Sequence, residues 1–325
     1  MKNICIVGYG NIGPAHAAAL ETVENANLYA VCDIDPVKQK AASDKYSVKV
    51  YSDFDEMLED KNIDGVHICT PHYLHYEMIV KALSAGKSVV SEKPVVMTKE
   101  QFELLKQIPG IDQVCLIFQN RLNPCAEMLK ALCDSKELGE ITCAKGIVTW
   151  IRTDEYYNSD AWRGKWETEG GGVLINQSIH TMDMLHYLVG GVRSVKANMA
   201  NYSLADVIEV EDTMTARMEF KNGAVGMFFA TNAYGINNTP DIEVVFEKGD
   251  ARYVHDTLYV NGEIVCHDVA ATGEKAYWGL GHSKLFHLYY DEGIYFSIAD
   301  VVDTMNTVYA VYESAKNGGK EVLIP

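Results

Sequence analysis

The chain has 325 residues, of which 48% are hydrophobic and 22% are charged, a composition typical of a globular protein of about two domains. Its formal net charge of −17 would repel nucleic-acid phosphates and anionic lipid surfaces, so neither kind of partner is expected. Without an apolar run of about 18 residues, and with Met1 leading directly into the first apolar segment, the sequence predicts no membrane span, no signal peptide and a cytoplasmic protein.

The first part of the chain alternates short apolar runs with helical patterns. The runs cover residues 3–7, 28–32, 64–69, 87–91 and 112–118. Such alternation predicts a parallel sheet with helices on both faces, and the nearly continuous apolar character of the runs is typical of strands covered on two sides. We therefore expect a Rossmann domain over residues 1–120.

A glycine-rich run, GYGNIG, lies between the first apolar segment and an alanine-rich helical pattern. Gly8 permits a tight turn, Gly10 lets the backbone approach a pyrophosphate, and Gly13 lets the helix pack close to the strand. Asn11 and Ile12 complete the loop, whose N–H groups would face the anion at the start of the helix. Taken alone, the hexapeptide is equally compatible with an ordinary glycine-rich loop.

Asp33 supplies the context that the glycine run needs. It ends the apolar segment LYAVCD, about 20 residues after Gly13, where a carboxylate accepts hydrogen bonds from an adenosine ribose. No arginine stands beside it to neutralise a 2′-phosphate, so we expect NAD as the cofactor, and NADP is less favoured. The alternative interpretation is a solvated acidic turn, which fits Asp35 before Pro36.

The tripeptide Glu92-Lys93-Pro94 follows the fourth apolar run. Ligands bind open α/β sheets beyond the carboxyl ends of the strands, so Lys93 is predicted to face the nicotinamide region. Pro94 restrains Lys93 to an extended backbone and prevents the strand from running into a helix. A surface Glu-Lys pair is the alternative.

After residue 120 the pattern changes to strands that alternate apolar and polar residues. A helix is expected near 123–136, strands over 209–220, 224–231 and within 240–267, and a final core-facing helix over 298–316. Lys221, Asn222 and Gly223 supply the chemistry of a hairpin turn between two of the strands. Residues 121–325 are therefore expected to form an α+β domain with a mainly antiparallel open sheet.

The segment EGGGVLINQSIHTMDMLHYLVGG predicts a helix that begins after three glycines and ends at the glycine pair. Asn176, His180, Asp183 and Tyr187 recur at i, i+4, i+7 and i+11, so they would form one polar stripe. The stripe belongs either to a cleft or to a satisfied buried network, and a lone histidine on a helix more often belongs to the second.

Several motifs together resemble the glucose–fructose oxidoreductase and inositol dehydrogenase (Gfo/Idh/MocA) family. They are GYGNIGPAH, CTPHYLH, SEKP, FQNR, GGGVLINQSIHTMDMLHYLVG, YWGLGH and VYESAK, and they span nearly the whole chain. The resemblance implies a Rossmann domain, a second domain with an open sheet, and homodimers or homotetramers assembled through that sheet. It also implies oxidation or reduction of a small sugar, polyol or sugar derivative with a nicotinamide cofactor.

Carried over by position, the resemblance assigns site residues. The family's lysine and helix histidine fall on Lys93 and His180. The positions beside the cofactor fall on Thr70, Pro71, His75, Glu92 and Gln119. Arg121, Trp162 and Arg163 are weaker candidates for the substrate pocket, with surface or interdomain packing as the alternative.

One position departs from the family pattern. Many members have an aspartate four residues before the histidine, where this chain has Asn176. An amide can orient His180 but cannot stabilise its cation as a carboxylate does. Asp183, one turn later, could supply the charge or could instead anchor the helix.

The sequence thus predicts a dehydrogenase in which His180 accepts the hydroxyl proton and cationic Lys93 stabilises the developing alkoxide, although the two roles could be exchanged. A lyase or hydrolase that uses NAD transiently, oxidising a glycoside at C3 before elimination, remains a second hypothesis. A non-catalytic, cofactor-bound regulator is a third. No metal site is expected, since His282 and His287 do not share a helical face.

Overall fold

The computed structural model describes residues 1–268 and 280–325, which form two compact units. The first unit comprises Met1–Gln119 and Gly281–Asp300, and the second comprises Asn120–Leu280 and Val301–Pro325. The chain therefore returns to the first unit after the bulk of the second, which a single boundary at residue 120 does not describe. The assignment of nucleotide binding to residues 1–120 and substrate binding to residues 121–325 stays a prediction.

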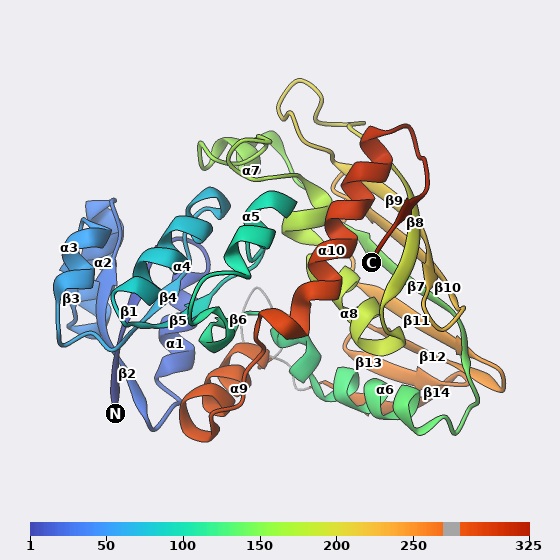
Figure 1. The fold of residues 1–325 in the computed structure, drawn as a ribbon, viewed down its shortest axis with the longest axis horizontal. Coiled ribbons are helices and arrows are strands. Elements are labelled where there is room, and N and C mark those ends of the chain that lie inside the picture. The colour runs from blue at the N-terminus through green and yellow to red at the C-terminus, as the bar shows by residue number, and fades with distance from the viewer. Residues whose placement is uncertain (269–279) are drawn as a thin grey trace. The chain divides into compact units, whose positions relative to one another are not determined.

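The first unit contains a parallel sheet in the order β3-β2-β1-β4-β5-β6 (Figure 1). Its strands are β1 (Lys2–Val7), β2 (Ala26–Cys32), β3 (Lys49–Tyr51), β4 (Gly65–Ile68), β5 (Ser88–Ser91) and β6 (Cys115–Leu116). Ile4, Ile6, Val66 and Ile68 are fully buried, as expected for strands covered on both faces. The predicted Rossmann sheet is confirmed. Of the six strands, β3 alone was not predicted, because this three-residue strand is largely exposed and has no apolar run.

The first unit also contains helices, all but the last of which lie between β1 and β6 in the chain. The α-helices are α1 (Gly13–Leu20), α2 (Pro36–Tyr46), α3 (Phe54–Glu59), α4 (His75–Ser84), α5 (Lys99–Leu105) and α9 (Gly281–His287), and shorter turns lie at His72–Leu74, Ile111–Gln113 and Leu288–Glu292. Two N-caps are carboxylates, since Asp35 accepts from the Val37 amide at the start of α2 and Asp53 accepts from the Glu56 amide at the start of α3. Asp35 was expected in a solvated acidic turn before Pro36, and the structure adds its role as the N-cap of α2.

The second unit is built on an open sheet in the order β14-β13-β12-β11-β7-β10-β9-β8-β15. The strands are β7 (Ile141–Thr149), β8 (Val192–Ala200), β9 (Thr213–Phe220), β10 (Val225–Thr231), β11 (Asp241–Phe246), β12 (Gly249–Val254), β13 (Thr257–Val260), β14 (Glu263–His267) and β15 (Val322–Leu323). All pairings between the described strands of this sheet are antiparallel except β10 with β7. The expected mainly antiparallel sheet is confirmed.

The second unit also contains helices. They are α6 (Pro124–Ser135), α7 (Asp154–Asn158), α8 (Ile179–Val189) and α10 (Ile298–Lys316), which begins in the last residues of the first unit, and a 3-10 turn covers Gln119–Leu122. Close packing of α8 on β7 depends on Gly146, where a Cβ atom would lie 2.8 Å from Cγ2 of Thr181. Helix α10 contacts β8, where the Ser314 hydroxyl accepts a hydrogen bond of 2.9 Å from the Ala197 amide.

The helix expected after the three glycines is interrupted, which corrects one prediction. Val173–Gln177 forms a π-helical turn, and α8 begins only at Ile179. Ser178 separates the two segments because both its amide and its hydroxyl bond to the carbonyl oxygen of Val173. Asn176 and His180 therefore do not share one regular α-helical stripe.

All eight cysteines are free thiols, six of them buried. Among the described helices, none has both the length and the apolar character needed to cross a membrane.

Candidate active site

The glycine loop follows β1 at the carboxyl edge of the parallel sheet. Gly8 has a φ of +88°, and a Cβ atom there would lie 2.7 Å from the carbonyl oxygen of Cys69. At Gly13 a Cβ atom would lie 2.5 Å from the carbonyl oxygen of Gly8. A Cβ atom on Gly10, by contrast, would meet no atom of the described chain within 4 Å. The fold itself requires Gly8 and Gly13, whereas Gly10 leaves open space over the loop.

Asn11 is exposed in this loop, and Ile12 forms the N-cap position of α1 without a side-chain cap. No side chain at Ile12 caps the first amides of α1. A helix N-terminus that binds an anion requires such uncapped amides.

Asp33 follows β2 and connects its strand end to the glycine loop. Its Oδ2 accepts a hydrogen bond of 2.6 Å from the Tyr9 amide, and its Oδ1 accepts one of 2.9 Å from the Asp35 amide. The carboxylate is therefore held at the sheet edge beside the loop.

His75 connects the loops after β4 and β5. Its Nδ1 lies 2.7 Å from the carbonyl oxygen of Pro94, and its Nε2 lies 3.0 Å from that of Thr70. Burial lowers the pKa of this imidazole, although its bonds to the two carbonyl groups oppose the shift. His75 is fully buried and positions the Thr70-Pro71 turn and the Lys93-Pro94 segment relative to each other.

Lys93 follows β5, with its amide 3.2 Å from Oε2 of Glu92. The other oxygen of Glu92, Oε1, lies 3.0 Å from Nε2 of His16 and 3.4 Å from Nε2 of His282. Burial would raise the pKa of Glu92, but hydrogen bonds from the two histidines outweigh it and leave that pKa well below its usual value. The carboxylate that was predicted beside the nicotinamide is thus engaged in fixing the backbone at Lys93.

The hydrogen-bond network around Glu92 continues through His16 to His67 and Tyr290. Nδ1 of His16 lies 3.0 Å from Nδ1 of His67, and Nε2 of His67 lies 2.7 Å from the hydroxyl of Tyr290. Burial lowers the pKa of both histidines. One ligand atom each from His16, Glu92 and His282 lie within 4.8 Å of one another, so these residues are the set in the described chain that could hold a metal ion. Because the separations to Glu92 are those of hydrogen bonds, we interpret the set as a hydrogen-bond network.

Gln119 ends the first unit after β6, and its side chain is 98% buried. Its backbone packs against Gly281, where a Cβ atom would lie 2.5 Å from the carbonyl oxygen of Gln119. Gly281 and His282 belong to the YWGLGH motif, while Tyr277, Trp278 and Gly279 of that motif lie outside the described residues.

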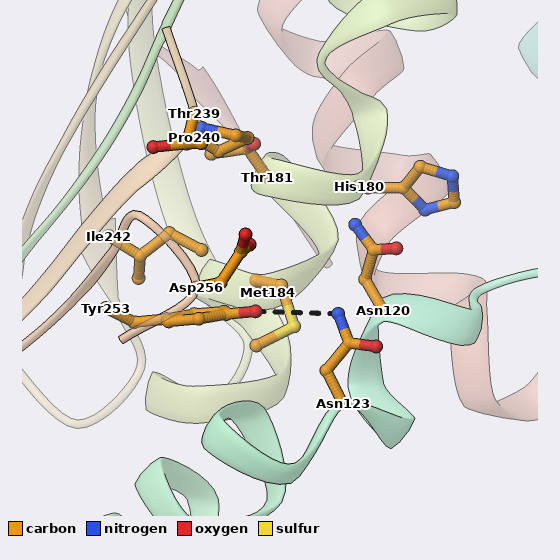
Figure 2. Close-up of a pocket in the computed structure, with 10 residues that line it drawn as sticks. All are labelled: Asn120, Asn123, His180, Thr181, Met184, Thr239, Pro240, Ile242, Tyr253 and Asp256. Atoms are coloured by element: carbon orange, nitrogen blue, oxygen red, sulfur yellow. Dashed lines mark hydrogen bonds between the residues drawn. The ribbon is translucent and has the colours of Figure 1, made fainter. Parts of the chain in front are cut away.

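His180 lines a pocket within the second unit (Figure 2). The pocket combines one imidazole, amide, hydroxyl and carboxyl groups, and a few apolar side chains. Its described lining is Asn120, Asn123, His180, Thr181, Met184, Thr239, Pro240, Ile242, Tyr253 and Asp256. Such a mixture of convergent polar groups with an apolar wall is typical of small-molecule sites.

Asn176, the departure from the family pattern, is paired with a carboxylate. Its Nδ2 donates to Oε1 of Glu169, whose Oε2 accepts from the Gly164 amide. Glu169 is fully buried, and burial raises its pKa to about 7 against the opposing hydrogen bonds. The amide at position 176 thus has a buried acidic group behind it, which the sequence comparison did not reveal.

Asp183 and Arg121 form a buried ion pair with each other. The guanidinium bonds to both carboxylate oxygens, at 2.8 Å from Nε and 2.5 Å from Nη2. Thr304 of α10 donates a further bond of 2.8 Å to Oδ1. Asp183 therefore anchors α8, as the sequence left open. The predicted substrate role of Arg121 is the weaker interpretation, because its guanidinium is held in this pair.

Arg163 and Trp162 lie in the segment after α7. The Arg163 guanidinium lies 4.6 Å from the Trp162 ring centre, donates a bond of 2.7 Å to the Tyr156 hydroxyl and pairs with Asp160 at 3.2 Å. Neither residue is among the described residues that line the His180 pocket. The packing alternative describes their contacts within this unit, and a role in binding substrate stays a prediction.

Sequence reasoning missed six polar residues of the pocket: Asn120, Asn123, Thr181, Thr239, Tyr253 and Asp256. Asn120 stands inside the quoted FQNR motif, so that motif could have indicated it. Asp256 lies in the two-residue turn between β12 and β13, with a φ of +52°, and belongs to no recognisable motif. It reaches the pocket only through strand pairing.

Two family models match the chain. An oxidoreductase family with an NAD-binding Rossmann fold covers residues 2–118, and the GFO/IDH/MocA C-terminal domain covers residues 126–252.

Individual proteins are similar over most of their length. The scyllo-inositol 2-dehydrogenase (NAD(+)) of Bacillus subtilis (strain 168) is 30% identical, over 78% of this chain and 75% of that protein. The D-glucoside 3-dehydrogenase of Escherichia coli (strain K12) is 29% identical, over 81% of this chain and 80% of that protein. The crystal structure of the WlbA dehydrogenase from Bordetella pertussis, in complex with NADH and UDP-GlcNAcA, superposes with a TM-score of 0.86 at 29% identity and covers 100% of this chain and 99% of that chain.

Proposed function

This chain belongs to the GFO/IDH/MocA family of NAD-binding oxidoreductases, and from that premise we propose that it transfers a hydride between NAD and a secondary alcohol of a sugar, polyol or sugar derivative. The observation that carries the proposal is the open space over Gly10, bordered by a loop whose other glycines the fold itself requires. A backbone that approaches a pyrophosphate closely needs that space.

Residues of the first unit would hold the cofactor. Gly8, Gly10 and Gly13, with Asn11 and Ile12, would bind the pyrophosphate, and Asp33 would accept from the ribose of NAD. Thr70, Pro71, His75, Glu92 and Gln119 would shape the nicotinamide side, with His75 and Glu92 acting through the backbone that they hold. When bound, NAD supplies the hydride acceptor.

Lys93 and His180 would both act on the reacting alcohol. His180 would take the hydroxyl proton on a ring nitrogen, because a neutral imidazole is suited to general-base catalysis near neutral pH. The Lys93 ammonium would stabilise the developing alkoxide. Asn176 would orient His180, and the buried Glu169 would in turn hold Asn176.

The pocket around His180 supports a polyhydroxylated substrate. Its amides, hydroxyls and carboxylate can each bond to a sugar hydroxyl, and its apolar wall of Met184, Pro240 and Ile242 suits the C–H face of a ring. The similar proteins named for inositol and glucoside oxidation support the same class of substrate.

A homodimer or homotetramer formed through the open sheet, and a cytoplasmic location, are part of the same proposal. Large apolar side chains are exposed on the sheet strands, among them Val225 and Met227 of β10 and Ile264 and Val265 of β14. Exposed apolar groups of this kind are typical of surfaces that bury against a partner.

A screen for NADH formation tests the proposal. Neutral sugars, polyols, sugar acids, phosphosugars and glycosides would be offered with NAD and with NADP in parallel. We expect NADH from at least one sugar or polyol and a preference for NAD. Absence of cofactor reduction by every compound, with a folded protein that binds NAD, would contradict it.

A redox-neutral lyase or hydrolase is the second candidate. The first step of its cycle is oxidation of a glycoside at C3, so the similarity to a D-glucoside 3-dehydrogenase favours it. The two candidates differ in accumulated NADH. A dehydrogenase forms one NADH for each substrate oxidised, whereas the redox-neutral cycle cleaves the glycoside without net NADH.

A further inference from the structure

The pocket that contains His180 presents hydrogen-bond acceptors that are not matched by donors of the protein. Oδ1 of Asn120 and Oδ1 of Asn123 are both buried, and neither has a hydrogen-bond partner in the described part of the chain. Asn123 as a whole is 96% buried. A buried carbonyl oxygen without a donor is unfavourable, so its presence on residues that line a pocket favours a ligand that donates.

The orientation of the Asn123 amide follows from its neighbour. The Tyr253 hydroxyl donates its hydrogen to Oδ2 of Asp268, so the hydroxyl oxygen can only accept from Asn123. Nδ2 of Asn123 accordingly faces Tyr253, at 3.5 Å, as the dashed line in Figure 2 shows. The carbonyl oxygen on the other side of the amide group has no hydrogen-bond partner in the described part of the chain.

Asp256 adds a charged acceptor. Its backbone carbonyl accepts a bond of 2.8 Å from the Asp268 amide, but within residues 1–268 and 280–325 its carboxylate makes no hydrogen bond or ion pair. Burial and the charge of Asp268 raise the pKa of this carboxyl group, and His255 opposes the shift.

No cation stands among the described lining residues to balance that charge. The arginine adjacent in sequence to Asn120, Arg121, is held by Asp183. An anionic group that enters this pocket would therefore meet the Asp256 carboxylate with no lysine or arginine of the described lining to offset the repulsion, whereas a hydroxyl would donate to that carboxylate.

We propose that Asn120, Asn123 and Asp256 form a subsite that binds hydroxyl groups of an uncharged polyol or sugar and discriminates against sugar acids and phosphosugars. The inference rests on the proposed function for its choice of a sugar-like ligand. Asp256 is the specificity-determining residue, because one carboxylate can accept from two neighbouring hydroxyls and repels a second carboxylate.

The test compares neutral sugars with their acids in three proteins. D-Glucose and D-galactose would be paired with D-glucuronate and D-galacturonate, and methyl β-D-glucopyranoside with its uronate. Binding would be measured by isothermal titration in the presence of NADH, and kcat/KM with NAD for every pair that reacts. The proteins are the wild type, Asp256→Asn and the control Asp206→Asn, which removes the same charge at an exposed loop position. Asparagine tolerates the positive φ at position 256, so this variant is expected to fold.

We expect the wild type and Asp206→Asn to favour the neutral member of at least one pair by about 100-fold, and Asp256→Asn to reduce that ratio by at least about tenfold. Equal or tighter binding of the acids by the wild type would overturn the inference, as would equal ratios in the two variants or binding of neither member of any pair. Failure of the proposed function can be distinguished from failure of this inference. The neutral ligands would then bind more tightly than their acids, in the expected ratio, but no NADH would form.

Discussion

Arg121 binds Asp183 through two hydrogen bonds, at 2.8 Å from Nε to Oδ2 and 2.5 Å from Nη2 to Oδ1, and both side chains are buried in the second unit. The pair connects the turn before α6 to α8, and Thr304 extends it to α10. Because His180 lies on the same helix as Asp183, this ion pair fixes the helix that carries the proposed base.

Removing one partner of this pair should destabilise the protein strongly. Arg121→Leu or Asp183→Leu leaves a buried charge without its counterion, and we expect each to lose about 3–5 kcal/mol of unfolding free energy. The double variant, which leaves no charge, should lose less than either single variant. Urea unfolding of the three proteins measures this, and single variants within about 0.5 kcal/mol of wild type would contradict it.

Glu169 should make stability depend on pH. Its folded pKa is raised to about 7 from an ordinary value of 4.5, so the protonated form is favoured in the folded state. The contribution of protonated Glu169 to the unfolding free energy is fully present below the ordinary pKa of 4.5 and is lost as the pH rises through the folded pKa. The total loss is about 3 kcal/mol.

Glu169→Gln is the matched variant, because the amide keeps an acceptor for Asn176 and cannot ionise. We expect its unfolding free energy to change less between about pH 5 and pH 8 than that of wild type. Parallel pH dependences of the two proteins would show that Glu169 does not titrate in this range.

Gly10→Ala and Gly13→Ala should separate binding from folding. A Cβ atom at Gly10 meets no described atom within 4 Å, so this variant should keep its melting temperature and lose NAD affinity by at least about tenfold. At Gly13 the Cβ atom lies 2.5 Å from the Gly8 carbonyl oxygen, so the melting temperature should fall as well. Unchanged NAD affinity in Gly10→Ala would contradict the prediction that the pyrophosphate binds at that loop.

Asp33 should determine the choice of cofactor. Asp33→Asn keeps an oxygen for the Tyr9 amide but loses the charge that accepts from a ribose and repels a 2′-phosphate. We expect NAD to bind about tenfold more weakly and the ratio of NAD to NADP affinity to fall. Fluorescence titration with NADH and NADPH checks both, and a retained preference for NADH would assign selectivity to other residues.

Local sequence patterns predicted much of the fold, because buried parallel strands need continuous apolar runs and the glycine loop needs small residues at fixed spacing. The interruption between Gln177 and Ile179 was not predictable from the i, i+4 pattern, since it arises from Ser178 bonding back to Val173.

Contacts between distant segments were also missed. The Glu92 carboxylate meets His16 and His282, 76 and 190 residues away, and Asp256 reaches the pocket through the pairing of β12 with β13. The sequence gives no periodic or motif signal for either.

We propose above that NAD accepts a hydride from an alcohol carbon of a sugar or polyol, and that Lys93 and His180 act on the hydroxyl group of that carbon. The most direct measurement is single-turnover transfer of deuterium to NAD from a substrate deuterated at the reacting carbon, in wild type, Lys93→Met and His180→Asn. Lys99→Met and His267→Asn, both at exposed positions, serve as matched controls.

We expect deuterium on the reduced nicotinamide in wild type and both controls, and transfer at least about 100-fold slower in Lys93→Met and His180→Asn. A nicotinamide that never carries the label, or wild-type rates in both of those variants, would contradict the account.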